Sequence, residues 1–204
     1  TSSHPDIVTA LGDRASDGFG SLVKSLGDLD GTTGVTTGDG DAVNGVDYVL
    51  ISNTNANQSR TLTLPQVFIF RLDDNAGNLS ASLVYNATGE GGSMLASNVM
   101  VIDDINGDGI NEFLISHPYG GGRHGLTGNV KIYSGTEIAK KKESEALIQS
   151  LFNPDNQQSN FGSELLYSDI TGDGLKDFLI GAPSYSTETR SNVGTIYVFP
   201  VKPI

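Results

Sequence analysis

Oxygen-bearing side chains occupy the first, third, fifth and ninth positions of the stretch DINGDGINEF, residues 104 to 113. A tight loop can turn alternate side chains toward one interior point, and Gly109 at the sixth position permits the sharp turn. Oxygen ligands of this kind suit Ca²⁺, whereas Mg²⁺ requires a stricter octahedral geometry. The loop therefore predicts a calcium site with ligands from Asp104, Asn106, Asp108, the main-chain carbonyl of Ile110, and Glu112.

A second loop, DITGDGLKDF at 169 to 178, repeats the arrangement. Its predicted ligands are Asp169, Thr171, Asp173, the main-chain carbonyl of Leu175, and Asp177. An EF-hand begins in the same way but needs a bidentate Glu at its twelfth position, where this chain has Ile115 and Ile180. The other alternative is an ordinary hairpin turn rich in Asp and Asn. Two matching loops, placed identically before EFLIS and DFLIG, argue against that alternative.

A third Asp-rich loop departs from this pattern. It begins with Asp28 and Asp30 but then inserts TTGVTTGDGDAVNG before Asp47, so 19 positions separate its ends, where 8 separate those of the loop at 104–112. The alignment of Asp47 is ambiguous because DYVLIS is one residue longer than EFLIS. Candidates for the missing middle ligand are Asp39 and Asp41. The sequence thus predicts two calcium sites and leaves the third as either an elaborated site or a lost one.

The elements that must position these loops also repeat. The first aspartates, Asp28, Asp104 and Asp169, lie 76 and 65 residues apart, which leaves room for about four strands in each unit. Short apolar runs broken by Gly, Asn and Asp are typical of strands joined by turns. We therefore predict an all-β protein with three propeller-type blades of four antiparallel strands, at about 15–88, 89–153 and 158–202.

The third unit lacks a fourth strand of its own. The N-terminal segment PDIVTALGDRASDGFGS is similar to ALIQSLFNPDNQQSNFGS, so a strand at 5–12 is predicted to complete the third blade. Propellers typically have about 4 to 8 blades, so three blades do not close alone. Two explanations stay open: a homodimer that forms a six-bladed propeller, or a longer parent protein with further blades. A two-sheet sandwich is the alternative fold.

Composition narrows the function classes. A net charge of -12 repels phosphate backbones and anionic lipid heads, which argues against nucleic-acid binding and membrane insertion. The stretch GGGRHG at 120–125 fits a dinucleotide fingerprint formally, but a strand rather than a helix follows it. We expect His117 and His124, near this stretch, to be solvated loop residues. The 24 acidic residues leave a carboxylate pair for glycoside hydrolysis as an alternative.

The motif FGS at 19–21 and 161–163, the Asp-rich loops, and IGAP at 180–183 together resemble the FG-GAP repeat family. That family includes the repeats of integrin α-subunit propellers and of many bacterial surface and secreted proteins. The second unit departs from the motif, with SML at 93–95 in place of FGS and SHP at 116–118 in place of GAP. The resemblance implies a propeller in which each cation fixes the loop between the first two strands of a blade. The family's ligand positions match Asp28, Asp30 and Asp47 only in part.

These expectations describe a non-catalytic, calcium-binding adhesion or binding module. The resemblance implies an extracellular location or a bacterial cell surface, with the periplasm as an alternative. The expected partners are a protein or glycan ligand and, in the dimer explanation, a second copy of the chain. Two alternative functions stay open: a carbohydrate-active propeller enzyme with a carboxylate pair, and a purely structural array of blades within a larger surface protein.

Overall fold

The computed structural model describes residues 18–31, 47–53, 64–75, 78–89, 95–120 and 127–201. Three sheets and two short helices make up the regular structure of these ranges. The strand predicted at 5–12, the candidates Asp39 and Asp41, and His124 all lie outside the described residues. Completion of the third blade by the N-terminal strand therefore stays a prediction.

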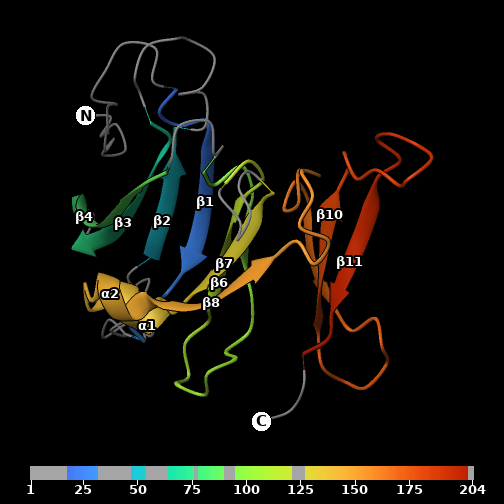
Figure 1. Cartoon of the computed structure of the whole chain (residues 1–204). Helices are drawn as coiled ribbons and strands as arrows, with labels where there is room; N and C mark the ends of the chain where they lie inside the picture. Colours follow the sequence, from blue (N-terminus) through green and yellow to red (C-terminus); the bar gives the residue numbers. More distant parts are fainter. Residues whose placement is uncertain are drawn as a thin grey trace, which may run out of the picture.

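The three sheets lie side by side in chain order (Figure 1). The first sheet has the order β1-β2-β3-β4, with strands Leu22–Gly27, Asp47–Ser52, Gln66–Asn75 and Asn78–Thr88. The second has the order β5-β6-β7-β8, with strands Val99–Val101, Phe113–His117, Asn129–Tyr133 and Leu147–Phe152. The third contains β9, β10 and β11, which are Leu165–Ser168, Asp177–Ala182 and Thr195–Phe199.

Every pair of neighbouring strands in these sheets is antiparallel. The prediction of an all-β fold built from propeller-type blades is thus confirmed. Four strands are present in the first two sheets, whereas the third has three strands among the described residues. The sheets lie inside the predicted blade ranges, and the exact blade boundaries stay predictions.

A repeated hydrogen bond aligns the three units. In each, a backbone N–H from the turn before the first strand donates to a carbonyl near the end of the second strand. The pairs are Gly20 to Ser52 (3.0 Å), Ala96 to Ser116 (2.8 Å) and Gly162 to Gly181 (3.0 Å). Leu95 and Ala96 therefore take the place of Phe and Gly in the second unit, so the sequence alignment of SML at 93–95 with FGS was wrong. Ala96 accepts the left-handed backbone that glycine adopts elsewhere, with φ of 56°.

The alignment defines two faces for each sheet. We call the face that carries Phe113 and Ile115 of β6, or their counterparts, the front face. The opposite face, which carries Leu114 of β6 or its counterpart, is the back face, because successive side chains of a strand point to opposite sides. All five residues of β6 are buried, so the middle sheet is covered on both faces.

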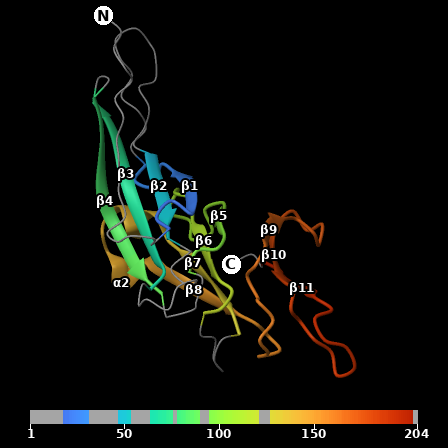
Figure 2. The same ribbon diagram turned by 90° about the horizontal axis from the view of Figure 1, so that it is seen from above.

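Two apolar clusters join the sheets. One packs the front face of the second sheet, including Phe113 and Ile115, against Leu50 and Ile69 on the back face of the first sheet. The other packs the front face of the third sheet, including Phe178 and Ile180, against the back face of the second sheet. Seen from above, the three sheets follow one another with the second between the other two (Figure 2). The same front-on-back packing thus occurs twice.

The charged connector between the third and fourth strands of the second sheet is helical. It forms α1, Gly135–Ala139, and α2, Glu143–Ala146. The Ser134 hydroxyl caps α1 by accepting a hydrogen bond from the N–H of Glu137 (3.3 Å). No helix within the described ranges is long and apolar enough to span a membrane.

Candidate metal site

The loop between β5 and β6 curls around the carboxylate of Asp104. This carboxylate accepts hydrogen bonds from the backbone N–H groups of Gly107 (2.7 Å), Asp108 (3.2 Å) and Gly109 (2.7 Å). These bonds, led by that of Gly109, lower the pKa of Asp104. Gly107 and Gly109 have φ of 81° and 87°, a backbone that L side chains rarely adopt. The two glycines therefore permit the tight loop that the sequence predicted.

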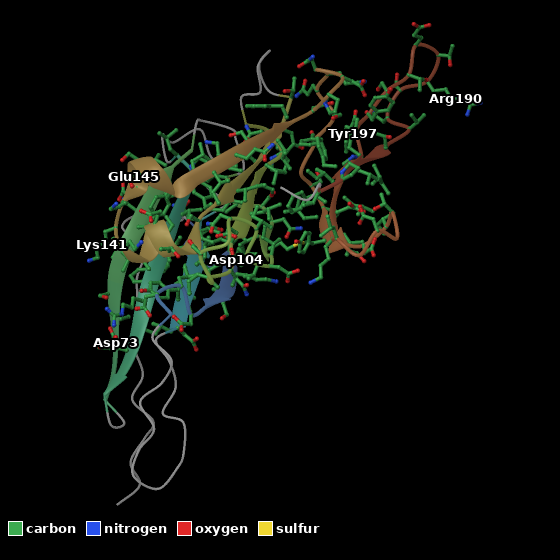
Figure 3. The ribbon with its side chains drawn as sticks, turned by 90° about the horizontal axis from the view of Figure 1, so that it is seen from below. Asp73, Asp104, Lys141, Glu145, Arg190 and Tyr197 are labelled. Carbon is green, nitrogen blue, oxygen red and sulfur yellow. The ribbon has the colours of Figure 1, made fainter. Side chains whose placement is uncertain are left out.

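Three carboxylates converge in this loop. The group consists of one carboxylate oxygen from each of Asp104, Asp108 and Glu112, and these three atoms lie within 4.8 Å of one another. Among the described residues this is the one acidic group that meets this distance. The amide of Asn106 donates to Glu112 Oε1 (2.8 Å). The structure thus brings together all four predicted side-chain ligands, and Figure 3 shows Asp104 between the first and third sheets. The carbonyl ligand predicted at Ile110 stays a prediction.

Glu112 is the buried member of the group, with no exposed surface. Burial, followed by the negative charges of Asp108 and Asp104, raises its pKa to about 7, although the N–H of Ile105 donates to Oε2 (2.7 Å). A buried carboxylate beside two others carries unfavourable charge unless a cation or a proton neutralises it. The oxygen atoms of the three carboxylates suit a hard divalent cation such as Ca²⁺.

The loop between β9 and β10 has the same curl but a different final carboxylate. Asp169 accepts from the N–H groups of Gly172 (2.6 Å) and Gly174 (3.0 Å), as Asp104 does in the preceding unit. Asp177 instead accepts from the backbone N–H groups of Ile170 (3.0 Å) and Thr171 (3.1 Å) within the loop and from that of Val201 (3.3 Å), which follows β11. Burial opposes these bonds, yet together they lower the pKa of Asp177.

The predicted ligands of this loop are therefore placed less uniformly. Asp173 Oδ1 accepts a hydrogen bond from the N–H of Leu175 (2.9 Å). Asp108 makes the equivalent hydrogen bond with the N–H of Ile110, so these two side chains have the same backbone partner in their loops. Among the described residues, the carboxylates that lie within 4.8 Å of one another are those of Asp104, Asp108 and Glu112. Asp169, Asp173 and Asp177 do not meet this distance. The ligand roles of Thr171 and of the Leu175 carbonyl stay predictions.

In the first unit a tyrosine replaces the final carboxylate. The repeated hydrogen bond that aligns the units makes Tyr48, not Asp47, the counterpart of Glu112 and Asp177. The Tyr48 hydroxyl donates to Asp30 Oδ2 (3.1 Å), and burial together with Asp30 raises the pKa of this tyrosine. The side chain of Asp47 is exposed.

A guanidinium also lies beside this loop. Arg71 Nε is 3.9 Å from Asp30 Oδ2, and Arg71 Nη2 is 3.0 Å from Asp73. Asp28 accepts from the backbone N–H groups of Asp30 (3.0 Å) and Gly31 (2.9 Å). Sequence reasoning missed Tyr48 and Arg71. The signal that could have shown this is the length of DYVLIS, which is one residue longer than EFLIS. When the ends of the two strands are aligned, Tyr48 and not Asp47 stands opposite Glu112, the ninth residue of the loop at 104–112.

The loops of the second and third units border one hollow. Lys176 extends across it and pairs with Asp103 (2.8 Å), while its ammonium lies 5.3 Å from the centre of the Tyr167 ring. Asp104 and Asn106 line the same hollow as Gly174 and Leu175. The two predicted sites are thus neighbours on one edge of the molecule.

His117 does not match its expected role. It is the last residue of β6 and is buried, and this burial lowers its pKa to about 3. Nε2 has no hydrogen-bond partner among the described residues. The expectation of a solvated loop residue was therefore wrong for His117, because this residue belongs to β6 and its side chain is buried. A neutral buried histidine fits a packing role.

Comparisons with known proteins agree with this architecture. Residues 161–199 match the family model described as the FG-GAP repeat. The chain is also 32% identical over 109 residues, half of its length, to a protein named Integrin alpha-PS3 from Drosophila melanogaster. It spans only 8% of the length of that relative. These findings confirm the resemblance stated from the sequence motifs, and residues 161–199 of the chain form an FG-GAP repeat.

Proposed function

We propose that the protein is a calcium-stabilised binding module of the integrin-like FG-GAP type. The convergence of Asp104, Asp108 and Glu112 carries this proposal. Calcium would be held there by these carboxylates and, once the Asn106 amide turns from its hydrogen bonds with Asp108 and Glu112, by the oxygen of that amide. Asp169, Thr171, Asp173 and Asp177 would form a second site. The main-chain carbonyls of Ile110 and Leu175 complete the proposed ligand sets. The ion supplies positive charge and rigidity to loops at one edge of the blades.

The first unit enters this proposal differently. We assign no calcium to Asp28, Asp30 and Asp47, because the Tyr48 hydroxyl and the Arg71 guanidinium already face Asp30. A guanidinium offers the positive charge that an ion would bring. The proposed number of calcium sites is therefore two.

A calcium titration tests the proposal. We expect isothermal titration calorimetry of the whole chain to fit two sites, and Asp108→Asn to remove one of them. The asparagine keeps an oxygen for the N–H of Ile110, which Asp108 accepts at 2.9 Å, so the loop loses charge rather than its curl. Glu188→Gln is the matched control, since it removes an exposed carboxylate far from both loops. Unchanged stoichiometry in Asp108→Asn would refute the site.

The partner and location rest on the integrin-like relative. We propose an extracellular or surface location and a protein partner, bound without catalysis; a glycan partner and a bacterial or periplasmic location stay sequence predictions. Cells should attach saturably to a surface coated with the chain in calcium and detach in EDTA. Attachment that is equal in EDTA, or turnover of a polysaccharide by the chain, would contradict a calcium-dependent binding module.

A further inference from the structure

An asparagine–glycine pair lies inside the candidate metal loop. Two such pairs occur in the chain, at 44–45 and 106–107, and the second lies within the described residues. Glycine has no side chain, so its backbone nitrogen can reach the side-chain carbonyl carbon of a preceding asparagine with little hindrance. Asn106 and Gly107 are exposed, and a Cβ built on Gly107 would meet no atom of the described residues within 4 Å. The pair therefore has the chemistry and the access to water that deamidation requires.

We propose that Asn106 is a deamidation site and that calcium in the same loop controls the reaction. The Gly107 nitrogen loses its proton and bonds to Cγ of Asn106, while the Cγ–Nδ2 bond breaks and Nδ2, after taking up a proton, leaves as ammonia. Water then opens the cyclic imide on either side, which gives aspartate or isoaspartate at position 106. One water is consumed and one ammonia is released, so the reaction needs no oxidant or reductant.

The closed loop holds both reacting groups in other contacts. The N–H of Gly107 donates to Asp104 Oδ1 (2.7 Å). The Asn106 amide donates from Nδ2 to Asp108 Oδ2 (3.2 Å) and to Glu112 Oε1 (2.8 Å), and its Oδ1 accepts from the N–H of Asp108 (2.9 Å). The attack needs the nitrogen without its proton and the amide turned toward it. Deamidation should therefore proceed from a loop that has opened locally.

Calcium selects against the opened loop. This step rests on the proposed function, whereas the chemistry of the asparagine–glycine pair does not. In the vacant loop, the like charges of three neighbouring carboxylates favour opening. An ion that binds only the closed loop, at about 100 times its Kd, makes the opened loop about 100-fold rarer. Deamidation in calcium should slow by the same factor, so the reaction modifies vacant loops and spares occupied ones.

The two products have opposite effects on the site. Aspartate at position 106 adds a fourth carboxylate to the loop, and calcium affinity rises with the charge of the ligands. Isoaspartate instead routes the main chain through the side chain, which inserts one more carbon atom before Gly107. The insertion displaces the N–H groups of Gly107 and Gly109, whose hydrogen bonds close the loop on Asp104. The isoaspartyl loop should therefore lose its calcium.

The third unit supplies a matched variant. Thr171 and Gly172 occupy the same two places in the loop at 169–177. Gly172 has a φ of 76° and donates to Asp169 (2.6 Å), as Gly107 donates to Asp104, but threonine has no amide to lose. Asn106→Thr thus introduces a side chain that the same loop backbone accepts, and it removes the reaction.

Peptide mapping by mass spectrometry, with separation of the aspartyl isomers, tests the site. The whole chain is incubated at mildly alkaline pH in CaCl₂ or in EDTA, over several half-lives of a synthetic peptide of residues 102–112. We expect conversion of Asn106 in EDTA and, at about 100 times Kd of calcium, conversion about 100-fold slower. Asn111 should stay intact in both, because the side chain of Glu112 hinders its reaction. An intact Asn106 in EDTA would overturn the site, and equal rates would overturn its control by calcium.

Calorimetry before and after the incubation separates this inference from the proposed function. Wild-type chain kept in EDTA should lose calcium at one site in proportion to its isoaspartate content, whereas Asn106→Thr should titrate identically before and after. Full stoichiometry despite isoaspartate would refute the predicted loss. Conversion of Asn106 in a fresh chain that binds no calcium would refute the proposed function and leave the modification site standing. A chain that binds two calcium ions and keeps Asn106 intact in EDTA would refute the modification site alone.

Discussion

The loops at 104–112 and 169–177 share a motif but neutralise their final carboxylate in different ways. Glu112, one methylene longer than Asp177, lies among Asp104 and Asp108, and its pKa is raised to about 7. Asp177 lies among backbone N–H groups, and its pKa is lowered. One loop therefore gathers negative charge that needs a cation, whereas the other has already satisfied its last carboxylate with donors.

The difference teaches that a shared motif does not imply an equal need for metal. A ligand that binds only the folded protein stabilises it, and the gain is greater where the protein alone is strained by like charges. We infer that calcium contributes more to the loop at 104–112 than to the loop at 169–177. Four predictions test this comparison.

Removal of calcium should have the largest effect. At about 100 times Kd, each site adds about 2.7 kcal/mol, so loss of two sites should lower Tm by roughly 10 to 20 °C in a chain of this size. In calcium, Asp108→Asn should lower Tm more than Asp173→Asn does. Differential scanning calorimetry in CaCl₂ and in EDTA measures both effects. Equal losses in the two variants would break the comparison.

The second prediction contrasts the final carboxylates without calcium. In EDTA, Asp177→Asn should lower Tm by about 5 °C, because a carboxylate that accepts three backbone N–H groups is exchanged for a weaker acceptor. Glu112→Gln in EDTA should leave Tm unchanged or raise it, since the substitution removes a charge from an acidic group. A larger loss in Glu112→Gln than in Asp177→Asn would reverse our assignment.

Stability against pH gives the third prediction. The ordinary pKa of Glu112 is 4.5 and its folded value is about 7, so the folded state binds the proton more tightly. Its contribution to stability is complete below pH 4.5 and is lost as pH rises through about 7. In EDTA, urea midpoints should fall over this window, and Glu112→Gln should flatten the fall. Calcium should remove it too, because the ion stabilises the carboxylate form.

Much of this architecture follows from local sequence. The alternating oxygen side chains and the glycines that permit positive φ identify the loop at 104–112, because ligand spacing and turn geometry are both local properties. The different fate of Asp177 could not be predicted, since one of its donors, Val201, lies 24 positions away. The place of Tyr48 was ambiguous for a similar reason: its alignment depends on the hydrogen bond between Gly20 and Ser52.

The smallest expected effect concerns the first loop, where Tyr48 and Arg71 stand in for a final carboxylate and an ion. Tyr48→Phe removes the hydroxyl that donates to Asp30 (3.1 Å) while it keeps the buried ring, so it should cost about 1 kcal/mol in calcium and in EDTA alike. Urea denaturation measures this cost, and calorimetry should still find two calcium sites. A cost that appears only in calcium would mean that this loop also binds the ion. The contrast with Glu112 would then lie in the affinity of the three loops and not in the presence of a site.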